Sequence, residues 1–420
     1  MSHNLSVIVP TPAHSSVSGP LSYRSELPLA PGTLVRVPLG RREILGIVWD
    51  AQDEASSGRL EVENKLIAGV LDGVVPLSKN WRQLVTFAAS YYQRSVGEVA
   101  LAALPPQLRD LSTTQLARRL KRPPSPEIST AAAAQDGRVL SEEQLAALAQ
   151  FEGRSGPFLL YGVTGSGKTE VYLQAVQALL ARDEHAQALV MVPEINLTPQ
   201  LEARFVDRFG RAAVVPLHSG MTNPQRLKSW LAAHTGVARI LLGTRMAVFA
   251  SLPNLKLIVV DEEHDPSYKQ QEGARYSARD LAVYRGKLDG AKVMLGSATP
   301  SLESWQACEK GRYMRLDMPS RIGEGAAAGA PGGHGGLPQV RLVDMNLQQP
   351  RTVFSPQLLD ALGQRIERGE QSLIFLNRRG YAPVLACTAC DWKSECPNCS
   401  AYRVFHKIDR TLRCHHCGFT

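Results

Sequence analysis

The stretch GVTGSGKT (162–169) has the residue types and spacing of a loop that binds nucleotide phosphates. Its glycines let backbone N–H groups surround phosphate oxygens, and the start of the predicted helix adds positive potential. Lys168 would reach the β- and γ-phosphates, and the Thr169 hydroxyl would bind Mg²⁺. The alternative, a glycine-rich turn without function, is disfavoured by the strand before it and the helix after it. The predicted ATP-binding residues are Gly162, Val163, Thr164, Gly165, Ser166, Gly167, Lys168, Thr169 and Gln144.

An acidic pair follows a second apolar stretch, LIVVDEEH, about 90 residues further along the chain. In open α/β sheets, ligands bind at the carboxyl ends of strands, where Asp261 and Glu262 would lie. Asp261 would share Mg²⁺ with Thr169, and Glu262 would activate the attacking water. A solvated acidic turn is the alternative. We predict Lys168, Asp261 and Glu262 as the catalytic residues.

Six of the seven cysteines form three Cys-x-x-Cys pairs in the last 34 residues. Such clustering is typical of metal binding in a reducing compartment, and Zn²⁺ takes four ligands in a tetrahedron. Three pairs therefore fill one site and leave half of another. Cys308 stands apart and is expected to be a buried apolar residue. The predicted metal ligands are Cys387, Cys390, Cys396, Cys399, Cys414 and Cys417.

Other residues suit contacts with nucleic acid. The segment 265–285 mixes aromatic and cationic side chains, which stack on bases and pair with phosphates in single-strand binding. Gly243, Thr244 and Arg245 suit phosphate contacts, although a plain turn fits too. Ser297 and Thr299 could sense the γ-phosphate or simply cap a helix. The predicted DNA-binding residues are Arg41, Arg42, Thr244, Arg245, Tyr268, Lys269 and Arg275.

The elements that must position these residues change along the chain. Residues from about 5 to 50 alternate like strands, with a hairpin turn at 40–42, and residues 78–120 have helical spacing. From about 140, apolar strands alternate with helices, which predicts a doubly wound parallel sheet. The expected strands are FLLYG, ALVMVP, RILLGT, LKLIVV and KVMLGS, and a later helix, SPQLLDALGQRIERGEQ, precedes a further strand, SLIFLN.

Composition sets the broad class of protein. Apolar residues make up 44% and charged residues 20%, as in ordinary globular proteins, and no apolar run has membrane-spanning length. No signal segment opens the chain, so the expected location is the cytoplasm, with no membrane partner. The net charge of +8 favours a polyanionic partner. DNA binding would then be strongly salt-dependent and reside mainly in residues 5–105 and 265–285.

The order GVTGSGKTE, VPEINLTPQ, GTRMAVF, DEEHDPSYKQQEG, GSATPSLES and FLNRRGYAP resembles the PriA family of bacterial replication-restart helicases. The resemblance covers nearly the whole chain, including PGTLVRVPLGRREILGIV near the N-terminus. It implies a superfamily-two helicase that unwinds DNA 3′-to-5′ with ATP, binds forked and single-stranded DNA, and reloads the replicative helicase. Primosome proteins and single-strand DNA-binding protein are the partners that it implies.

The resemblance also implies how the cysteines pair. The family has four nested pairs, of which the inner two bind one zinc and the outer two another. Cys396, Cys399, Cys414 and Cys417 match the inner site, and Cys387 with Cys390 matches half of the outer one. Two zinc ions are therefore expected in the full-length protein and one complete site here, so the chain looks truncated. Histidines are the alternative ligands, at His406, His415 and His416.

The resemblance divides the chain into parts. The expected parts are a β-rich DNA-binding domain (1–110), a linker with a shortened or absent winged helix (111–139), a RecA-like lobe with the ATP site (140–320), a Gly/Ala-rich loop (321–338), the start of a second lobe (339–386) and an incomplete zinc-binding segment (387–420).

Several positions depart from the family pattern. The rest of the second lobe, with an arginine that reaches the γ-phosphate, is missing, so slow ATP turnover is expected. Ser22 stands where the family has an Asp that helps to recognise a 3′ end, so little 3′-end preference is expected. Ala274 stands where a Trp is frequent. A fork-binding scaffold that binds ATP without turning it over is therefore the alternative to a working helicase.

Overall fold

The computed structural model describes residues 2–10, 19–50, 65–111, 115–116, 139–193, 198–322, 339–348, 353–375, 384–387, 389–390, 392–398, 401–407, 409–414 and 419–420. The chain divides into two units, Met1–Gly336 and Leu337–Thr420, which we treat separately. Within the described part, no helix is both long and apolar enough to cross a membrane.

The N-terminal part of the first unit is an antiparallel sheet with strand order β2-β1-β4-β3-β5. The predicted hairpin is confirmed: Leu39 pairs with Arg42, and Gly40 takes the positive φ (63°) that its tight turn requires. The strands are β1 (His3–Ile8), β2 (Leu21–Ser25), β3 (Leu34–Leu39), β4 (Arg42–Val48) and β5 (Gly69–Val70).

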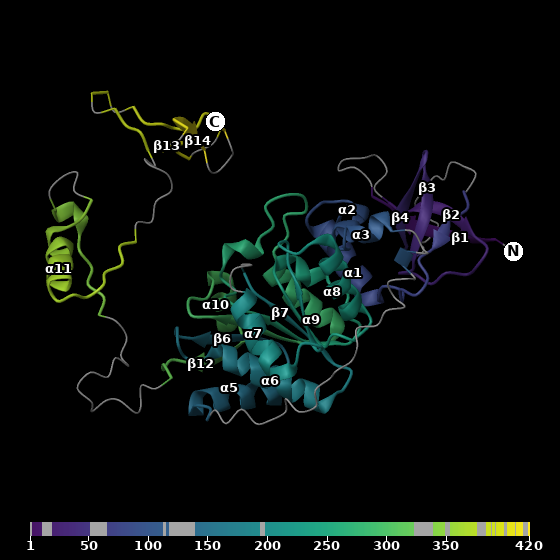
Figure 1. Cartoon of the computed structure of the whole chain (residues 1–420), viewed down its shortest axis with the longest axis horizontal. Helices are drawn as coiled ribbons and strands as arrows, with labels where there is room; N and C mark the ends of the chain where they lie inside the picture. The colour runs from purple at the N-terminus through teal and green to yellow at the C-terminus, as the bar shows by residue number, and fades with distance from the viewer. Residues whose placement is uncertain are drawn as a thin grey trace. The chain divides into compact units, whose positions relative to one another are not determined.

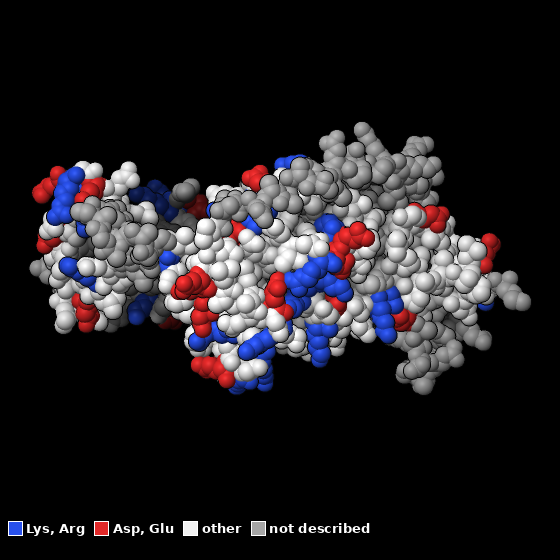
Figure 2. Space-filling model, turned by 90° about the horizontal axis from the view of Figure 1, so that it is seen from below, with Lys and Arg blue, Asp and Glu red and all other residues white. Residues whose placement is uncertain are grey.

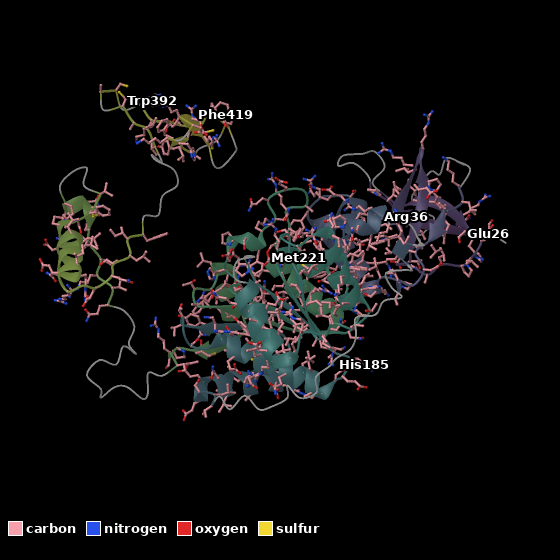
Figure 3. All side chains as sticks on the ribbon, in the orientation of Figure 1. Glu26, Arg36, His185, Met221, Trp392 and Phe419 are labelled. Atoms are coloured by element: carbon pink, nitrogen blue, oxygen red, sulfur yellow. The ribbon has the colours of Figure 1, made fainter. Side chains whose placement is uncertain are left out.

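Three helices follow this sheet: α1 (Lys79–Tyr91), α2 (Val96–Ala102) and α3 (Gln107–Asp110). Ser78 and Ser95 accept hydrogen bonds from backbone N–H groups in the first turns of α1 and α2, which explains where these helices begin. Arg36, labelled in Figure 3, projects from β3 and donates to the carbonyl oxygens of Leu108 (2.8 Å) and Leu111. This buried arginine therefore fixes the end of α3 to the sheet.

The rest of the unit is a seven-stranded sheet with order β12-β6-β11-β10-β7-β9-β8 and parallel pairing throughout. The five predicted strands are confirmed. The strands are β6 (Pro157–Gly162), β7 (Gln187–Met191), β8 (Val214–Leu217), β9 (Ile240–Gly243), β10 (Leu255–Val260), β11 (Lys292–Ser297) and β12 (Met314–Met318). The helices are α5 (Glu142–Gly153), α6 (Lys168–Arg182), α7 (Thr198–Phe209), α8 (Asn223–His234), η4 (Arg245–Phe249), η5 (Pro266–Tyr268), α9 (Ala278–Asp289) and α10 (Leu302–Glu309).

Successive residues of the central strands pack into two cores on opposite faces of this sheet. Leu160 and Val259 pack with α5, α6 and α7, whereas Leu159 and Ile258 pack with α8, η4 and α9. Helices therefore cover both faces, as Figure 1 shows, and the predicted doubly wound α/β fold is confirmed.

The second of these cores continues into the N-terminal helices. Side chains of α1, α2 and α3 belong to the same buried cluster as those of α8, η4 and α9. The Trp81 indole N–H donates to the Phe249 carbonyl (2.7 Å), and the His234 ring lies 2.9 Å from the Val75 carbonyl. The N-terminal part and the parallel sheet are thus packed as one body. Most of the predicted linker, residues 111–139, lies outside the described residues.

The second unit contains the predicted helix, as α11 (Pro356–Glu367), a short η6 (Met345–Leu347) and a small antiparallel pair, β13 (Val404–His406) and β14 (Thr411–Arg413). The predicted strand SLIFLN is wrong over its described residues, 372–375, which form no strand. Leu373 and Phe375 are 96% and 82% exposed and belong to none of the sheets of the described residues.

Candidate nucleotide site and DNA-facing groove

The residues predicted to do chemistry follow the carboxyl ends of neighbouring parallel strands. Gly162 ends β6, Asp261 follows β10, Ser297 ends β11, and Thr244 follows β9. β6, β11 and β10 are adjacent in the sheet, and β7 lies between β10 and β9. Because all of these strands are parallel, their carboxyl ends share one edge. We call this edge the ATP edge; strand pairing brings its residues together from distant parts of the sequence.

Helix α6 begins differently from its neighbours. Serine side chains cap α1, α2, α5, α9, α10 and α11, whereas α6 follows Gly167, which has φ 83° and provides no side-chain cap. The first N–H groups of α6 therefore lack the side-chain acceptor that these six helices have. An uncapped, glycine-led helix start directly after a strand suits a bound phosphate.

The loop before α6 is shaped by its glycines. A Cβ at Gly167 would collide with Gln144 Nε2 and Ile322 Cδ1, and Gly165 has φ 88°. The Ser166 hydroxyl is buried and has no hydrogen-bond partner among the described residues. A buried hydroxyl without a partner costs free energy unless a ligand satisfies it, so this loop fits a phosphate group.

Two side chains hold the loop in place. Lys168 is 9% exposed, and its Nζ donates to the Gly162 carbonyl (2.9 Å) across the loop. Gln144 is buried; its amide closes a capping box with Ser141 and donates to the Gly167 carbonyl (3.2 Å). Gln144 therefore positions the phosphate loop through Gly167. That Gln144 also contacts ATP stays a prediction.

The acidic pair is held beside this loop. Asp261 Oδ1 accepts a hydrogen bond from the Tyr172 hydroxyl (2.9 Å), which comes from α6. Burial raises the pKa of Asp261, although the Tyr172 hydrogen bond and the Lys168 charge oppose this effect. Glu262 has a positive φ of 45°, which is uncommon for a residue with a side chain. Bound Mg²⁺ would favour the ionised form of Asp261, so the pair fits an ATP·Mg²⁺ site.

The third acid, Glu263, was not singled out from the sequence. It is 1% exposed, and its carboxylate accepts from the Ser301 backbone N–H (2.7 Å), the Ser304 hydroxyl (2.9 Å) and Arg279 (3.3 Å). Glu263 thus ties the end of β10 to α9 and α10. The sequence signal for this role was an additional acid in DEEH (261–264), together with the serines of TPSLES (299–304), which supply its hydrogen-bond donors.

His264 connects the acidic stretch to the end of β11. Its Nδ1 lies 2.7 Å from the Ser297 hydroxyl and 3.6 Å from a Glu262 carboxylate oxygen. Its Nε2 lies 3.4 Å from the Thr299 hydroxyl. Ser297 and Thr299 are therefore connected to Glu262 through His264. Their predicted role of sensing the γ-phosphate requires such a connection, and that role stays a prediction.

The prediction that Tyr268 contacts DNA is wrong in this structure. Tyr268 is 2% exposed, and its hydroxyl donates to the carbonyl oxygens of Asp261 (2.7 Å) and Met191 (3.0 Å). The ring packs into the core beneath η5, because the η5 turn directs it inward. Tyr268 therefore supports the end of β10 and is not available to stack on a base.

The other predicted DNA-binding residues lie nearer the surface. Arg41 and Arg42 are exposed at the β3–β4 turn, and Lys269 and Arg275 are exposed in the loop after η5. Arg245 is half-buried and donates to the Ser267 carbonyl (3.2 Å), whereas Thr244 is 8% exposed. We call the segment that Arg245 contacts, residues 265–276, the residue 265–276 loop. Contact of these residues with DNA stays a prediction.

Charge on the surface is mixed on the face drawn in Figure 2. Lys and Arg side chains there are interspersed with Asp and Glu and do not form one continuous basic band. The net charge of +8 is therefore not gathered on that face. DNA binding would therefore depend on particular side chains.

Four of the six predicted zinc ligands are described: Cys387, Cys390, Cys396 and Cys414. Cys399 and Cys417, with His415 and His416, lie outside the described residues. The first cysteine of each pair makes the same backbone hydrogen bond, in which its N–H donates to the carbonyl five residues on: Cys387 to Trp392 (2.7 Å), Cys396 to Ala401 (2.9 Å) and Cys414 to Phe419 (2.7 Å).

Cys396 and Cys414, the first cysteines of two of these pairs, are buried. Thiolates are preferred zinc ligands, so the donor set fits zinc. The described residues alone bring together no group of three or more candidate ligands. Cys308, predicted to be buried, is half-buried against the core.

Comparison with known proteins agrees with these features. The DEAD/DEAH box helicase family matches residues 141–307, the 3'DNA-binding domain (3'BD) of PriA matches residues 6–105, and the PriA DNA helicase Cys-rich region (CRR) domain matches residues 396–420. These three matches cover the ATP edge, the N-terminal sheet with its helices, and the later cysteine pairs.

Individual relatives carry the same name. Replication restart protein PriA of Bacillus subtilis is 41% identical over 62% of this chain, and that of Haemophilus influenzae is 42% identical over 68%. PriA of Rickettsia prowazekii is 34% identical over 95% of this chain. The chain spans 31%, 38% and 58% of the lengths of these relatives. The chain belongs to the PriA family of replication restart proteins, a family of ATP-dependent DNA helicases.

Proposed function

We propose that this chain binds ATP·Mg²⁺ at the ATP edge and uses it to drive DNA unwinding at abandoned or stalled replication forks. The observation that carries the proposal is the juxtaposition of a phosphate loop at an uncapped helix start and the half-buried Asp261, joined by the Tyr172 hydrogen bond. The match to DNA helicase and 3′ DNA-binding families supports DNA as the substrate.

Each residue of the site has a stated task. Lys168 leaves the Gly162 carbonyl to pair with the β- and γ-phosphates, and the N–H groups that open α6 hold the same oxygens. Thr169 and Asp261 would hold Mg²⁺, which neutralises charge that develops on the phosphates. Glu262 would orient and deprotonate the attacking water. His264, which contacts Ser297, positions Glu262.

The same edge is joined to the residue 265–276 loop, which carries two of the exposed residues predicted to bind DNA. The Tyr268 hydroxyl holds the Asp261 carbonyl, and the neighbouring Ser267 carbonyl accepts from Arg245. A shift of the residue 265–276 loop when DNA binds would therefore move Asp261, which is next to Glu262, the predicted general base. This short path supports a motor in which DNA contact and ATP turnover are coupled.

Finer features follow from the family. The motor moves 3′-to-5′, primosome proteins and single-strand DNA-binding protein are partners, and the protein works in the cytoplasm. Cys396, Cys399, Cys414 and Cys417 bind one zinc ion, and Cys387 with Cys390 supplies half of a second site. Ser22, half-buried on β2, leaves little preference for a free 3′ end.

The experiment measures ATP binding and DNA-stimulated ATP hydrolysis by this chain. We expect a fluorescent ATP analogue to bind with Mg²⁺, and Lys168→Ala to weaken binding by about 10- to 100-fold because a charged phosphate contact is lost. Glu262→Gln should preserve binding and abolish any DNA-stimulated turnover. Absence of nucleotide binding by the unaltered chain would overturn the proposal.

The second candidate is a DNA-binding scaffold that binds ATP without turning it over. The observation that favours it is that the phosphate loop and Asp261, which would suffice for binding, are held by hydrogen bonds within the first unit itself. Normal ATP and DNA binding with turnover far below about 10 s⁻¹, a median value for enzymes, would favour the scaffold.

A further inference from the structure

A cavity of about 750 Å³ opens beside the ATP edge, between the N-terminal helices and the parallel sheet. We call it the α2 groove. Helix α2 forms one wall, η4 and the start of α8 form another, and the residue 265–276 loop closes the third. The lining residues that matter here are Glu98, Arg226, Thr244, Arg245, Phe249 and Tyr276.

The groove has an acidic side with an unsatisfied acceptor. Glu98 Oε2 is buried and has no hydrogen-bond partner among the described residues, while Oε1 lies 3.9 Å from Arg94. The residue 265–276 loop lies against this carboxylate, since a Cβ at Gly273 would sit 3.4 Å from Glu98 Oε1. A carboxylate oxygen held in this way can accept a hydrogen bond from an N–H group of a ligand.

The groove also has a basic side with an unsatisfied donor. Arg226 Nε is buried without a partner among the described residues, although its Nη2 donates to the carbonyls of Ser219 (3.1 Å) and Met221 (3.3 Å). Those two bonds fix the guanidinium and leave Nε aimed elsewhere. Arg245 and the Thr244 hydroxyl line the groove as well, so this side suits a phosphate.

Aromatic side chains contribute apolar surface to the groove. The rings of Phe249 and Tyr276 meet edge to face with centroids 5.0 Å apart, and both residues line the groove. These three surfaces match the three parts of a nucleotide in a DNA strand. The carboxylate suits the edge of the nucleobase, the aromatic rings suit its face, and the arginines suit the phosphate. The volume lies in the usual range of small-ligand pockets.

We propose that the α2 groove binds one unpaired nucleotide of the DNA strand and prefers guanine at that position. Glu98 accepts hydrogen bonds from the base edge, Phe249 and Tyr276 contact its face, and Arg226 binds the adjoining phosphate. This proposal deepens the proposed function, because it rests on single-strand binding by the same surface.

The chemistry of Glu98 selects the base. Guanine presents two adjacent donors, N1–H and N2–H, which a carboxylate can accept together. Cytosine and adenine each present one amino donor on the same edge, and thymine presents one imino donor beside two carbonyls that a carboxylate repels. A well-placed two-bond contact discriminates by at least about fivefold and often more, so a preference of about tenfold is expected.

The test measures the affinity of short fluorescent oligothymidylates that carry one central substitution. The unaltered chain should bind the strand with guanine, or with 7-deazaguanine, about tenfold more tightly than strands with adenine or cytosine. Hypoxanthine keeps N1–H and lacks the N2 amino group, so it should lie between them. Glu98→Gln, which keeps the shape of the side chain, should abolish the preference and bind plain oligothymidylate at least as tightly as the unaltered chain, because the carboxylate that repels the thymine carbonyls is gone.

Further variants separate the parts of the groove. Ala274→Phe, at a position that lines the groove, should block the site and abolish the preference without a change of charge. Arg226→Gln should weaken binding to every strand and reduce its salt dependence. Glu184→Gln is the matched control, because Glu184 lies beside His185 (labelled in Figure 3) and its side chain is 86% exposed. It should retain the guanine preference.

Equal affinity for all substituted strands would overturn the inference while leaving the proposed function standing. A guanine preference that survives in both Glu98→Gln and Ala274→Phe would overturn the assignment to this groove. Failure to bind any strand would overturn the proposed function and the inference with it. Retained binding of the ATP analogue shows that each variant is folded.

Discussion

The ATP edge and the cysteine-rich segment prepare their ligand sites in opposite ways. At the ATP edge, the functional residues follow strands buried on both faces, and Tyr172 and Tyr268 fix Asp261 from two directions. In the cysteine-rich segment, β13 and β14 have three residues each, and few of the described apolar residues around them are buried. We propose that packing shapes the first site, whereas the second needs a zinc ion to fold.

This difference separates two sources of stability. Packing of a large core holds the phosphate loop and the acidic pair in place before a nucleotide arrives. A segment as small as 396–420 cannot bury enough apolar surface to fold by itself, so metal binding must supply the free energy of folding. Four predictions test the two halves of this comparison.

The largest effect is expected from zinc removal. Cys414→Ser, or chelation, should unfold the β13–β14 hairpin, because a structural zinc contributes about 10 kcal/mol or more of apparent binding free energy. Amide hydrogen exchange over 401–414 and zinc content check this. Cys308→Ser is the matched control and should leave both unchanged. Persistent protection of the hairpin in a zinc-free chain would show that packing, and not the metal, holds it.

The next effect concerns the buried network behind the ATP edge. Glu263→Ala should destabilise the first unit by about 3–5 kcal/mol, because Arg279 loses its buried partner. Glu303→Ala is the control: that side chain is 76% exposed and lies 3.8 Å from the same Arg279. Urea unfolding measures both. Similar losses for the two variants would contradict a special role of the buried acid.

Acid should weaken the contact between the N-terminal part and the sheet. Burial lowers the pKa of His234 to about 4 from 6.5, so the folded chain keeps this ring neutral. Below pH 6.5 the unfolded chain binds a proton that the folded chain does not, so stability falls as the pH drops toward 4. The loss is roughly 3 kcal/mol in total.

Fluorescence of Trp230, whose ring stacks on His234 with centroids 4.7 Å apart, reports this unfolding locally. His234→Gln removes the titrating ring and should flatten this part of the pH dependence. An equally steep loss of stability between pH 6.5 and 4 in that variant would mean that other groups cause it.

The smallest effect tests how Asp261 is oriented. Tyr172→Phe removes the hydroxyl that donates to Asp261 and should weaken ATP·Mg²⁺ binding by about fivefold, because Asp261 keeps its place on the sheet and loses one orienting hydrogen bond. Binding of ATP without Mg²⁺ should change little, because the phosphate loop is untouched. Equal weakening with and without Mg²⁺ would place the effect in the loop and not in Asp261.

Much of the motor lobe could be predicted from the sequence because buried parallel strands leave apolar runs. The two strands that were missed, β8 and β12, are the edges of the sheet. The sequence of β8 contains Pro216, and β12 mixes apolar residues with Arg315 and Asp317. Edge strands need not be apolar on both faces, so they give a weaker signal.

The chemistry of the site was predicted where it depends on spacing within one motif, as in 162–169. It was missed where it depends on how separate elements pack. Tyr268 has the composition of a stacking residue, but the turn of η5 points it into the core. Glu263 gains its role from Arg279 of α9 and Ser304 of α10. Tyr172 gains its role from Asp261, which lies 89 residues further along the chain.

The most direct test of the account is a titration of ATP·Mg²⁺ into the chain before and after zinc is removed with a zinc-selective chelator. If packing alone shapes the ATP edge, the dissociation constant should agree within about twofold in the two states, and Lys168→Ala should weaken binding by about 10- to 100-fold in both. Loss of nucleotide binding on zinc removal, or binding that does not depend on Lys168, would contradict it.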